Sequence, residues 1–199
     1  MQDQIILYNG PNSPFGRKTK ITAFAQEIDF EEKIINVHEA DFLDKHNPIR
    51  KIPTLLVNKL SITDSDNICL YFDSISKKNT LFPKKNYWQI MNMTSIANGL
   101  MESVLERRME TIRPENEKSK NFINKQEVRI KRTIKWIENN WNNYNEEYLT
   151  MDQIAIACAL DYTIFRFNDK WKSDNQKING WFDNFKKKKF MQSTKPYDK

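Results

Sequence analysis

Short apolar runs and amphipathic stretches alternate along the first part of the chain. Residues 4–9 (QIILYN) form an apolar run that ends at a Gly-Pro pair, which is typical of a buried strand. Residues 14–28 and 65–76 carry apolar side chains at helical spacing. Further strands are expected at 33–37, 53–58 and 60–64. A crossover followed by a hairpin predicts a mixed, four-stranded sheet with helices packed on it.

The pattern becomes helical throughout after the polar segment 77–86. Apolar residues recur every three or four positions from Ile90 to Leu105 and from Ile130 to Ile137, and Pro114 separates these two helices. Residues 149–167 are almost continuously apolar, which predicts a buried helix that begins with a capping box of Thr150 and Gln153. We therefore expect an α/β domain over 1–80, a linker over 81–86 and an all-helical domain over 87–199.

Composition adds three limits to this picture. Hydrophobic residues at 39% and charged residues at 29% describe a folded globular protein. No apolar run approaches the roughly 18 residues of a membrane span, and the first residues do not resemble a signal peptide. The two cysteines, Cys69 and Cys158, are far apart in apolar settings, as in a reducing compartment. We expect a cytoplasmic protein that does not bind membranes.

The positive charge is concentrated in the second part of the chain. Residues 1–82 hold 10 Lys and Arg against 11 Asp and Glu, whereas residues 83–199 hold 22 against 15. The cations are scattered among acids, apart from four lysines at 186–189. Such a run is usually a solvated helix face or helix end, so we expect no nucleic-acid partner.

Several kinds of catalytic site have no support in the sequence. His38 and His46 are the only histidines, and neither has the spacing of a metal site or of a Ser-His-Asp triad. The four glycines form no nucleotide-binding fingerprint, and no Cys-x-x-Cys pair occurs. We expect no metal and no dithiol chemistry.

Three short motifs remain, and each has a purely structural explanation beside a functional one. Ser13, before Pro14, can cap a helix or hold an anion at its positive end. Pro53 can be an ordinary edge-strand proline, or a cis Ile52–Pro53 bond can turn the Ile52 backbone outward to pair with an extended peptide. Asp64 and Ser65 can cap a helix or bind an amino-acid zwitterion, with Asp64 facing the ammonium.

Taken in order over the whole chain, these motifs resemble the glutathione S-transferase superfamily, and within it the bacterial YibF-like members. The resemblance rests on the sets 13–18, 51–53 and 64–65 and continues through 97–102, 113–114, 154–167 and 188–196. It implies an N-terminal thioredoxin-like domain, an all-helical C-terminal domain and a homodimer. Two departures are Asp64, where relatives often have Glu, and Asp66, where they often have an apolar residue or proline.

The resemblance also implies a role for each motif. Ser13 would face the sulfur of glutathione as the catalytic residue. The remaining glutathione contacts would come from Lys51, Ile52, Pro53, Asp64 and Ser65. An electrophile would lie near Tyr8, Asn9 and Phe15.

Two functions follow from this resemblance. The first is an enzyme that uses glutathione as co-substrate and transfers it to small electrophiles, as in detoxification. The alternative is a catalytically weak binding or scaffold module that contacts a protein partner, for which the basic C-terminal half would serve.

Overall fold

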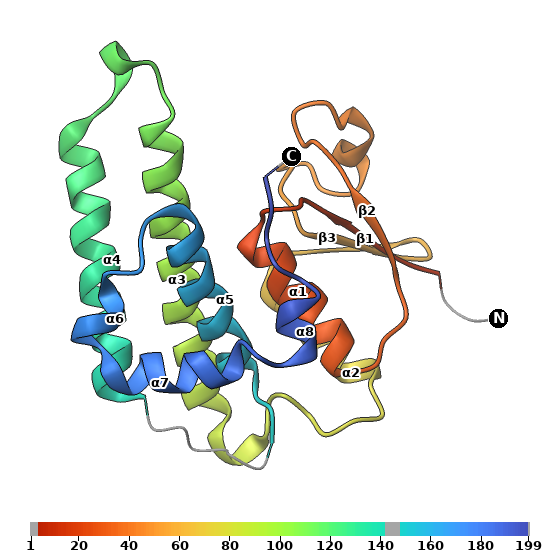
Figure 1. The fold of residues 1–199 in the computed structure, drawn as a ribbon. Helices are drawn as coiled ribbons and strands as arrows, with labels where there is room; N and C mark the ends of the chain where they lie inside the picture. Colours follow the sequence, from red (N-terminus) through yellow and green to blue (C-terminus); the bar gives the residue numbers. More distant parts are fainter. Residues whose placement is uncertain (1–3, 142–147, 199) are drawn as a thin grey trace. The chain divides into compact units, whose positions relative to one another are not determined.

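The computed structural model describes residues 4–141 and 148–198 (Figure 1). The chain divides into two compact units. The first comprises Met1–Leu81 together with Lys189–Lys199, and the second comprises Phe82–Lys188. Residues 189–199, which the sequence analysis assigned to the helical domain, group with the first unit because the short helix α8 (Lys189–Gln192) packs against α1 (Pro14–Ala25).

The first unit is built on a four-stranded sheet with the order β2-β1-β3-β4. Its strands are β1 (Ile5–Asn9), β2 (Glu31–Ile34), β3 (Thr54–Val57) and β4 (Leu60–Thr63). β2 runs parallel to β1, because α1 carries the chain back between them, whereas β1, β3 and β4 pair antiparallel. The predicted mixed sheet, with a crossover followed by a hairpin, is therefore confirmed.

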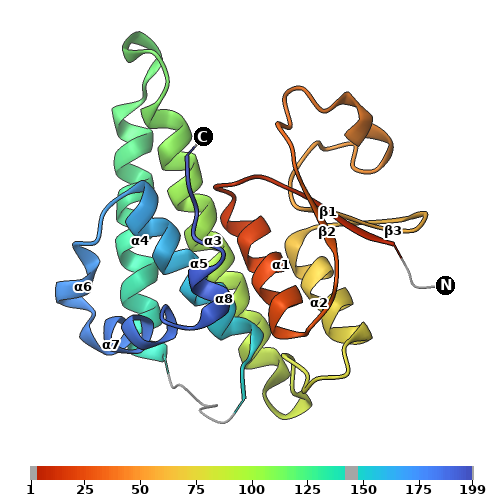
Figure 2. The same ribbon diagram turned by 45° about the vertical axis from the view of Figure 1, so that its right-hand side comes forward.

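The two faces of the sheet are buried by different elements. Helices α1 and α2 (Ser65–Ile75) cover one face (Figure 2), where Leu7 and Leu55 pack with Ile68 and Phe72. The short 3-10 turn η1 (Asp41–Lys45) contributes to the other face, where the alternate β1 residues Ile6 and Tyr8 pack against Leu43. Period-two alternation along β1 thus places neighbouring residues in two separate cores.

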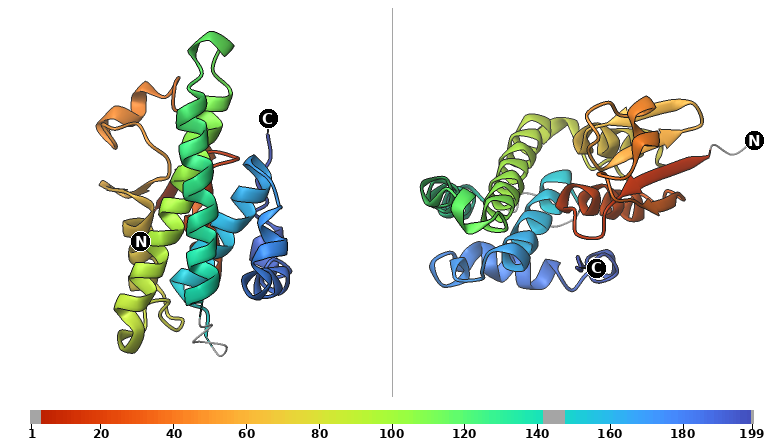
Figure 3. Two further views of the ribbon diagram at one scale, coloured as in Figure 1. Left: turned by 90° about the vertical axis from the view of Figure 1, so that its left-hand side faces the viewer. Right: turned by 90° about the horizontal axis from the view of Figure 1, so that it is seen from above.

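The second unit is entirely helical within the part that the structure describes. Its long helices α3 (Tyr87–Thr111) and α4 (Lys120–Asn140) pack side by side (Figure 3, left), and α5 (Met151–Arg166) packs against α3. The shorter elements are η2 (Lys84–Asn86), η3 (Glu115–Glu117), α6 (Trp171–Asp174) and α7 (Gln176–Phe185). The capping box predicted at Thr150 and Gln153 is present, with the Thr150 N–H donating to Gln153 Oε1 at 3.2 Å.

Two predicted boundaries were wrong. The helix expected to reach residue 28 ends at Ala25, because the chain leaves the helix through Glu27, whose φ is 55°. The strand expected at 33–37 lies at 31–34, because Glu31 to Ile34 pair with β1. Its apolar continuation, Ile35, packs against the cluster of Ile6 and Tyr8 without continuing the strand.

Candidate functional site

Ser13 begins helix α1 and caps it. Its backbone is extended, with φ −74° and ψ 119°, and its Oγ accepts a hydrogen bond from the Gly16 N–H at 3.1 Å. Pro14 follows at the first helical position, where no backbone N–H is needed. The cap uses the hydroxyl as an acceptor only, so the Ser13 O–H can still donate to a group in front of the helix.

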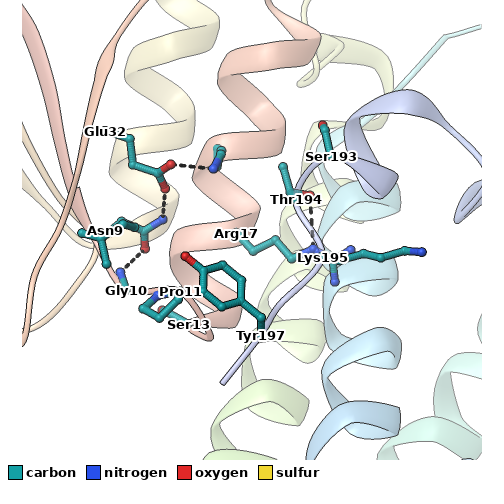
Figure 4. Close-up of a pocket in the computed structure, with 12 residues that line it drawn as sticks. Asn9, Gly10, Pro11, Ser13, Arg17, Glu32, Ser193, Thr194, Lys195 and Tyr197 are labelled. Carbon is teal, nitrogen blue, oxygen red and sulfur yellow. Dashed lines mark hydrogen bonds and ion pairs between the residues drawn. The ribbon is translucent and has the colours of Figure 1, made fainter. Parts of the chain in front are cut away.

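A small pocket of about 90 Å³ lies beside Ser13 (Figure 4). Its walls come from the end of β1, the first turns of α1, strand β2 and the C-terminal segment, including Arg17, Lys195 and Tyr197. Sites for small molecules are usually about 300–1,000 Å³, so this pocket can receive one end of a ligand at most.

Buried polar groups fix the walls of this pocket. Asn9 is 3% exposed; its Oδ1 accepts from the Gly10 N–H at 2.8 Å, and its Nδ2 donates to Glu32 at 2.9 Å. Lys20 pairs with the same carboxylate at 2.5 Å. Arg17 donates to the Met191 carbonyl at 3.1 Å and to Thr194 Oγ1 at 3.3 Å, which ties the C-terminal segment to α1.

The Ile52–Pro53 peptide bond, for which the sequence left a cis form open as one alternative, is cis. Asn47, 1% exposed, supports the loop before it by donating to the Lys51 carbonyl and to Thr54 Oγ1, both at 2.8 Å. Lys51 is itself exposed. Sequence reasoning missed Asn47, although an Asn-Pro pair is a recognised turn signal.

Arg50 holds the same loop from outside. It bonds to Asp44 and pairs with Asp41 at 2.8 Å, and its φ is 46°. The hydrogen bond from Arg50 lowers the pKa of Asp44, against a smaller opposing effect of burial.

Asp64 and Ser65 lie at the start of α2. Asp64 is the N-cap, with φ 72°, and its Oδ1 accepts from the N–H groups of Asp66 at 2.8 Å and Asn67 at 3.3 Å. The bonds that the structure records for the Asp64 carboxylate, among the described residues, all go to Oδ1. Ser65 is the first helical residue and is 6% exposed.

Asp66 is the partner of a buried cation. Lys18, whose side chain is 0% exposed, forms an ion pair with Asp66, whose side chain is 26% exposed. This pair joins the first turns of α1 and α2, the two helix ends that carry Ser13 and the Asp64–Ser65 pair. A spacing argument along one helix could not find it, because its two residues are 48 positions apart.

The residues expected near an electrophile divide between two places. Asn9 lines the pocket beside Ser13. Tyr8 points to the opposite face of the sheet, where its ring lies 5.3 Å from Phe42 and 6.4 Å from His46. Phe15 is half-buried in the first turn of α1 and is absent from the pocket lining.

The four lysines at 186–189 make local contacts. Lys186 pairs with Asp183 and lies over the Phe182 ring, and Lys188 lies 5.7 Å from the Phe185 ring. The run covers the end of α7, which matches the interpretation of a helix end.

The described residues contain neither a metal-ligand cluster nor a membrane-spanning helix. Within 4–141 and 148–198, no three His, Cys, Asp or Glu side chains gather as a metal site would need. Of the helices in that part of the chain, none combines the length and apolar character that crossing a membrane requires.

Comparison with known proteins identifies the type of fold and domain. Residues 3–74 match the family model of the glutathione S-transferase N-terminal domain. The GST-like protein YibF of Escherichia coli K12 is 26% identical over 166 residues, which are 80% of this chain and 82% of YibF.

Solved structures resemble the whole chain. A glutathione S-transferase from Methylobacillus flagellatus with GSH bound superposes with a TM-score of 0.91 at 23% identity, covering 98% of this chain and all of the other (100%). A glutathione transferase family member from Pseudomonas fluorescens with bound glutathione gives 0.89 at 24% identity over 98% and 100% of the two chains. Likeness at this identity establishes the fold.

Proposed function

We propose that the chain is a member of the glutathione S-transferase superfamily, which it resembles in its N-terminal domain and in its fold, and that it binds glutathione and activates its thiol for attack on small electrophiles. The observation that carries the proposal is the position of Ser13. Its hydroxyl caps α1 as an acceptor, retains its own proton and borders a pocket at the positive end of the helix. A thiolate placed there would receive both a hydrogen bond and the field of the helix.

The chemical effect of such a site is to raise the thiolate fraction. A free thiol has a pKa of about 8.5, so only about 3% is ionised at pH 7. A decrease of one pKa unit, about 1.4 kcal/mol, raises this fraction to about a quarter. The thiolate then forms a carbon–sulfur bond. Either the leaving group departs with its electron pair, or the thiolate adds to an activated double bond and the carbanion that forms takes a proton from water. Ser13 donates a hydrogen bond throughout and forms no covalent bond.

The remaining glutathione contacts are proposed on the adjacent loops. The outward backbone of Ile52, before Pro53, would pair with the cysteinyl residue, and Lys51 would face the distant carboxylate. Ser65, through its hydroxyl and its backbone N–H at the start of α2, would bind the γ-glutamyl carboxylate.

The Asp64 side chain would have two simultaneous functions. Its Oδ1 already accepts from the Asp66 N–H at 2.8 Å, so the γ-glutamyl ammonium would bind Oδ2. The shorter Asp side chain therefore suffices, because a carboxylate has two oxygens and only one is needed for the cap. A homodimer in the cytoplasm, with an electrophile bound near Asn9, completes the proposal.

Calorimetric titration of reduced glutathione into the purified protein tests the binding step. Ser65→Ala should weaken binding about tenfold, since a hydrogen bond to a charged group contributes about 1.5–3 kcal/mol. Ser74→Ala is the matched control, because Ser74 lies on the exposed side of the same helix and its hydroxyl donates to the Tyr71 carbonyl of that helix. Absence of binding at several millimolar glutathione would contradict the proposal and favour the binding module.

The thiol pKa of bound glutathione tests Ser13 itself. Its value, followed by the ultraviolet absorbance of the thiolate, should rise by about one unit in Ser13→Ala. Ser119→Ala is the matched control for loss of a cap, because Ser119 Oγ caps α4 by accepting from the Phe122 N–H at 3.2 Å. Equal thiol pKa values in wild type and Ser13→Ala would assign Ser13 to capping alone.

A further inference from the structure

The place of the Ser13 hydroxyl depends on the short loop 10–13, which connects β1 to α1. A hydrogen bond weakens steeply when its length and angle depart from the optimum, so this loop must hold the hydroxyl in one place. The Ser13 N–H donates to the Gly10 carbonyl at 3.3 Å. The position of Ser13 therefore follows that of Gly10.

The side chain of Asn9 connects Gly10 to strand β2 (Figure 4). Asn9 is the last residue of β1 and is buried. Its Oδ1 accepts from the Gly10 N–H at 2.8 Å, and its Nδ2 donates to Glu32 Oε1 at 2.9 Å. A carboxylate can only accept and a backbone N–H can only donate, so these two partners fix which end of the amide faces each of them.

The same amide packs against the first turn of α1. A Cβ built on Gly16 would lie 1.6 Å from Asn9 Oδ1 and 2.5 Å from Asn9 Cγ, so the amide fills the space of a side chain at position 16. Gly16 is also the residue whose N–H donates to Ser13 Oγ at 3.1 Å. Asn9 thus contacts both the loop residue and the helix residue that bond to Ser13.

The C-terminal segment contacts the loop as well, but from the solvent side. The N–H of Tyr197 donates to the Pro11 carbonyl at 3.4 Å, and Asn12 Nδ2 donates to Asp198 at 3.3 Å. Tyr197 and Asp198 are both exposed. These bonds are longer than those of Asn9, and water competes for exposed donors and acceptors. The buried contacts of Asn9 are therefore the stronger support of the loop.

We propose that Asn9 is a positioning residue for Ser13, which carries the fixed geometry of β2 to the hydroxyl that would face the thiolate. The proposal rests on the function proposed above. Asn9 acts through Gly10 and Gly16 and does not touch the reacting sulfur. Glu32 keeps the amide in its orientation, and Lys20 balances the charge of Glu32 at 2.5 Å.

Two substitutions of Glu32 test this role without placing a new charge in the site. Glu32→Ala removes the acceptor of the Asn9 amide and should raise the thiol pKa of bound glutathione by about half a unit. Glu32→Gln is the matched control, because it loses the same charge but can still accept from Asn9 through Oε1. Lys20, whose side chain is 23% exposed, can turn to water in both variants. The thiol pKa in Glu32→Gln should equal that of the wild type.

A rescue experiment tests Asn9 itself. Asn9→Asp keeps the shape but turns an oxygen toward Glu32, and two adjacent carboxylates repel each other. This variant should also raise the thiol pKa. Asn9→Asp with Glu32→Gln restores one bond, since the Gln amide can donate to the new carboxylate. The thiol pKa should then return to the wild-type value although the charge at position 9 remains, which excludes a direct effect of that charge.

S-Methylglutathione, which has no thiol, separates positioning of Ser13 from general damage to the site. Its affinity, measured by calorimetry, should be the same in the wild type, Glu32→Ala and Asn9→Asp. In a Ser13→Ala background, Glu32→Ala should cause no further rise of the glutathione thiol pKa, because the hydroxyl through which it acts is absent.

The possible failures are distinguishable. If Ser13→Ala raises the thiol pKa but Glu32→Ala and Asn9→Asp do not, the positioning role alone is overturned. Loss of S-methylglutathione in parallel with the rise, or a further rise in the Ser13→Ala background, overturns it too, because Asn9 would then support the whole site. If the wild type does not bind S-methylglutathione, or Ser13→Ala leaves the thiol pKa unchanged, the proposed function fails and the positioning role with it.

Discussion

Replacing Asp66 with Asn should destabilise the first unit more than replacing its partner Lys18. Lys18 is fully buried, and Asp66→Asn removes the carboxylate that pairs with its ammonium. Removing one partner of a fully buried pair costs about 3–5 kcal/mol. Since the Asp66 side chain is 26% exposed and can admit some water, we expect a loss of about 2–3 kcal/mol.

The reverse substitution should cost less. Lys18→Met fills the same space with an apolar chain, and the Asp66 carboxylate that remains is partly solvated and sits in the first turn of α2. A helix N-terminus stabilises a negative charge there by about 0.3–1 kcal/mol. We therefore expect Lys18→Met to cost about 1 kcal/mol, and the double variant to recover most of the loss caused by Asp66→Asn.

Urea unfolding must be followed by a signal from the first unit. All five tryptophans lie between Trp88 and Trp181 and report on the helical unit. Hydrogen exchange of peptides from α1 and α2 reports on the first unit directly. A loss under about 0.5 kcal/mol for Asp66→Asn, or a larger loss for Lys18→Met, would refute the reasoning. Because the pair joins the two helix ends of the proposed site, Asp66→Asn should also weaken glutathione binding.

Three further predictions concern packing and protonation. Gly16→Ala should lower stability by about 1–3 kcal/mol in thermal unfolding, because the added Cβ would overlap the buried, hydrogen-bonded Asn9 side chain. Gly99→Ala should instead raise stability by about 0.5–1 kcal/mol, because a Cβ at Gly99 meets open space and alanine favours the helix. Asn47→Ala removes both bonds that its amide donates and should cost about 2 kcal/mol; unchanged loop protection in hydrogen exchange would contradict this. Burial raises the pKa of Asp152, so the contribution of this group to stability is full below its ordinary pKa of 3.8 and is lost as pH rises through the pKa of the folded state. The free energy of unfolding of the wild type, relative to that of Asp152→Asn, should therefore increase as pH falls from 7 to 4. Urea unfolding measures this difference, and a difference that is constant with pH would contradict the prediction.

The sheet could be predicted from sequence because apolar runs and turn signals are local. The strand at Glu31 to Ile34 was displaced in the prediction because apolar character indicates burial, and Ile35 is partly buried against a neighbouring cluster although the strand ends at Ile34. Ser13 and Asp64 were predicted as possible caps from their positions alone, and both cap their helices.

Contacts between distant segments could not be predicted in this way. Lys18 and Arg17 have the appearance of ordinary charged residues on a helix, yet they are 0% and 6% exposed. Their burial depends on Asp66 and on the segment around Thr194, and no local pattern indicates which distant residue supplies the partner.

The return of the C-terminal segment to α1 has a consequence for biosynthesis and for engineering. During translation the sheet and its helices emerge before the helical unit, whereas the wall that contains Thr194 and Tyr197 emerges after it. The hydrogen bonds from Arg17 to Met191 and Thr194 can therefore form only after the entire helical unit has been synthesised. A deletion that removes residues 193–197 is thus a change beside Ser13, although Arg17 and Thr194, which connect the two segments, are 177 positions apart.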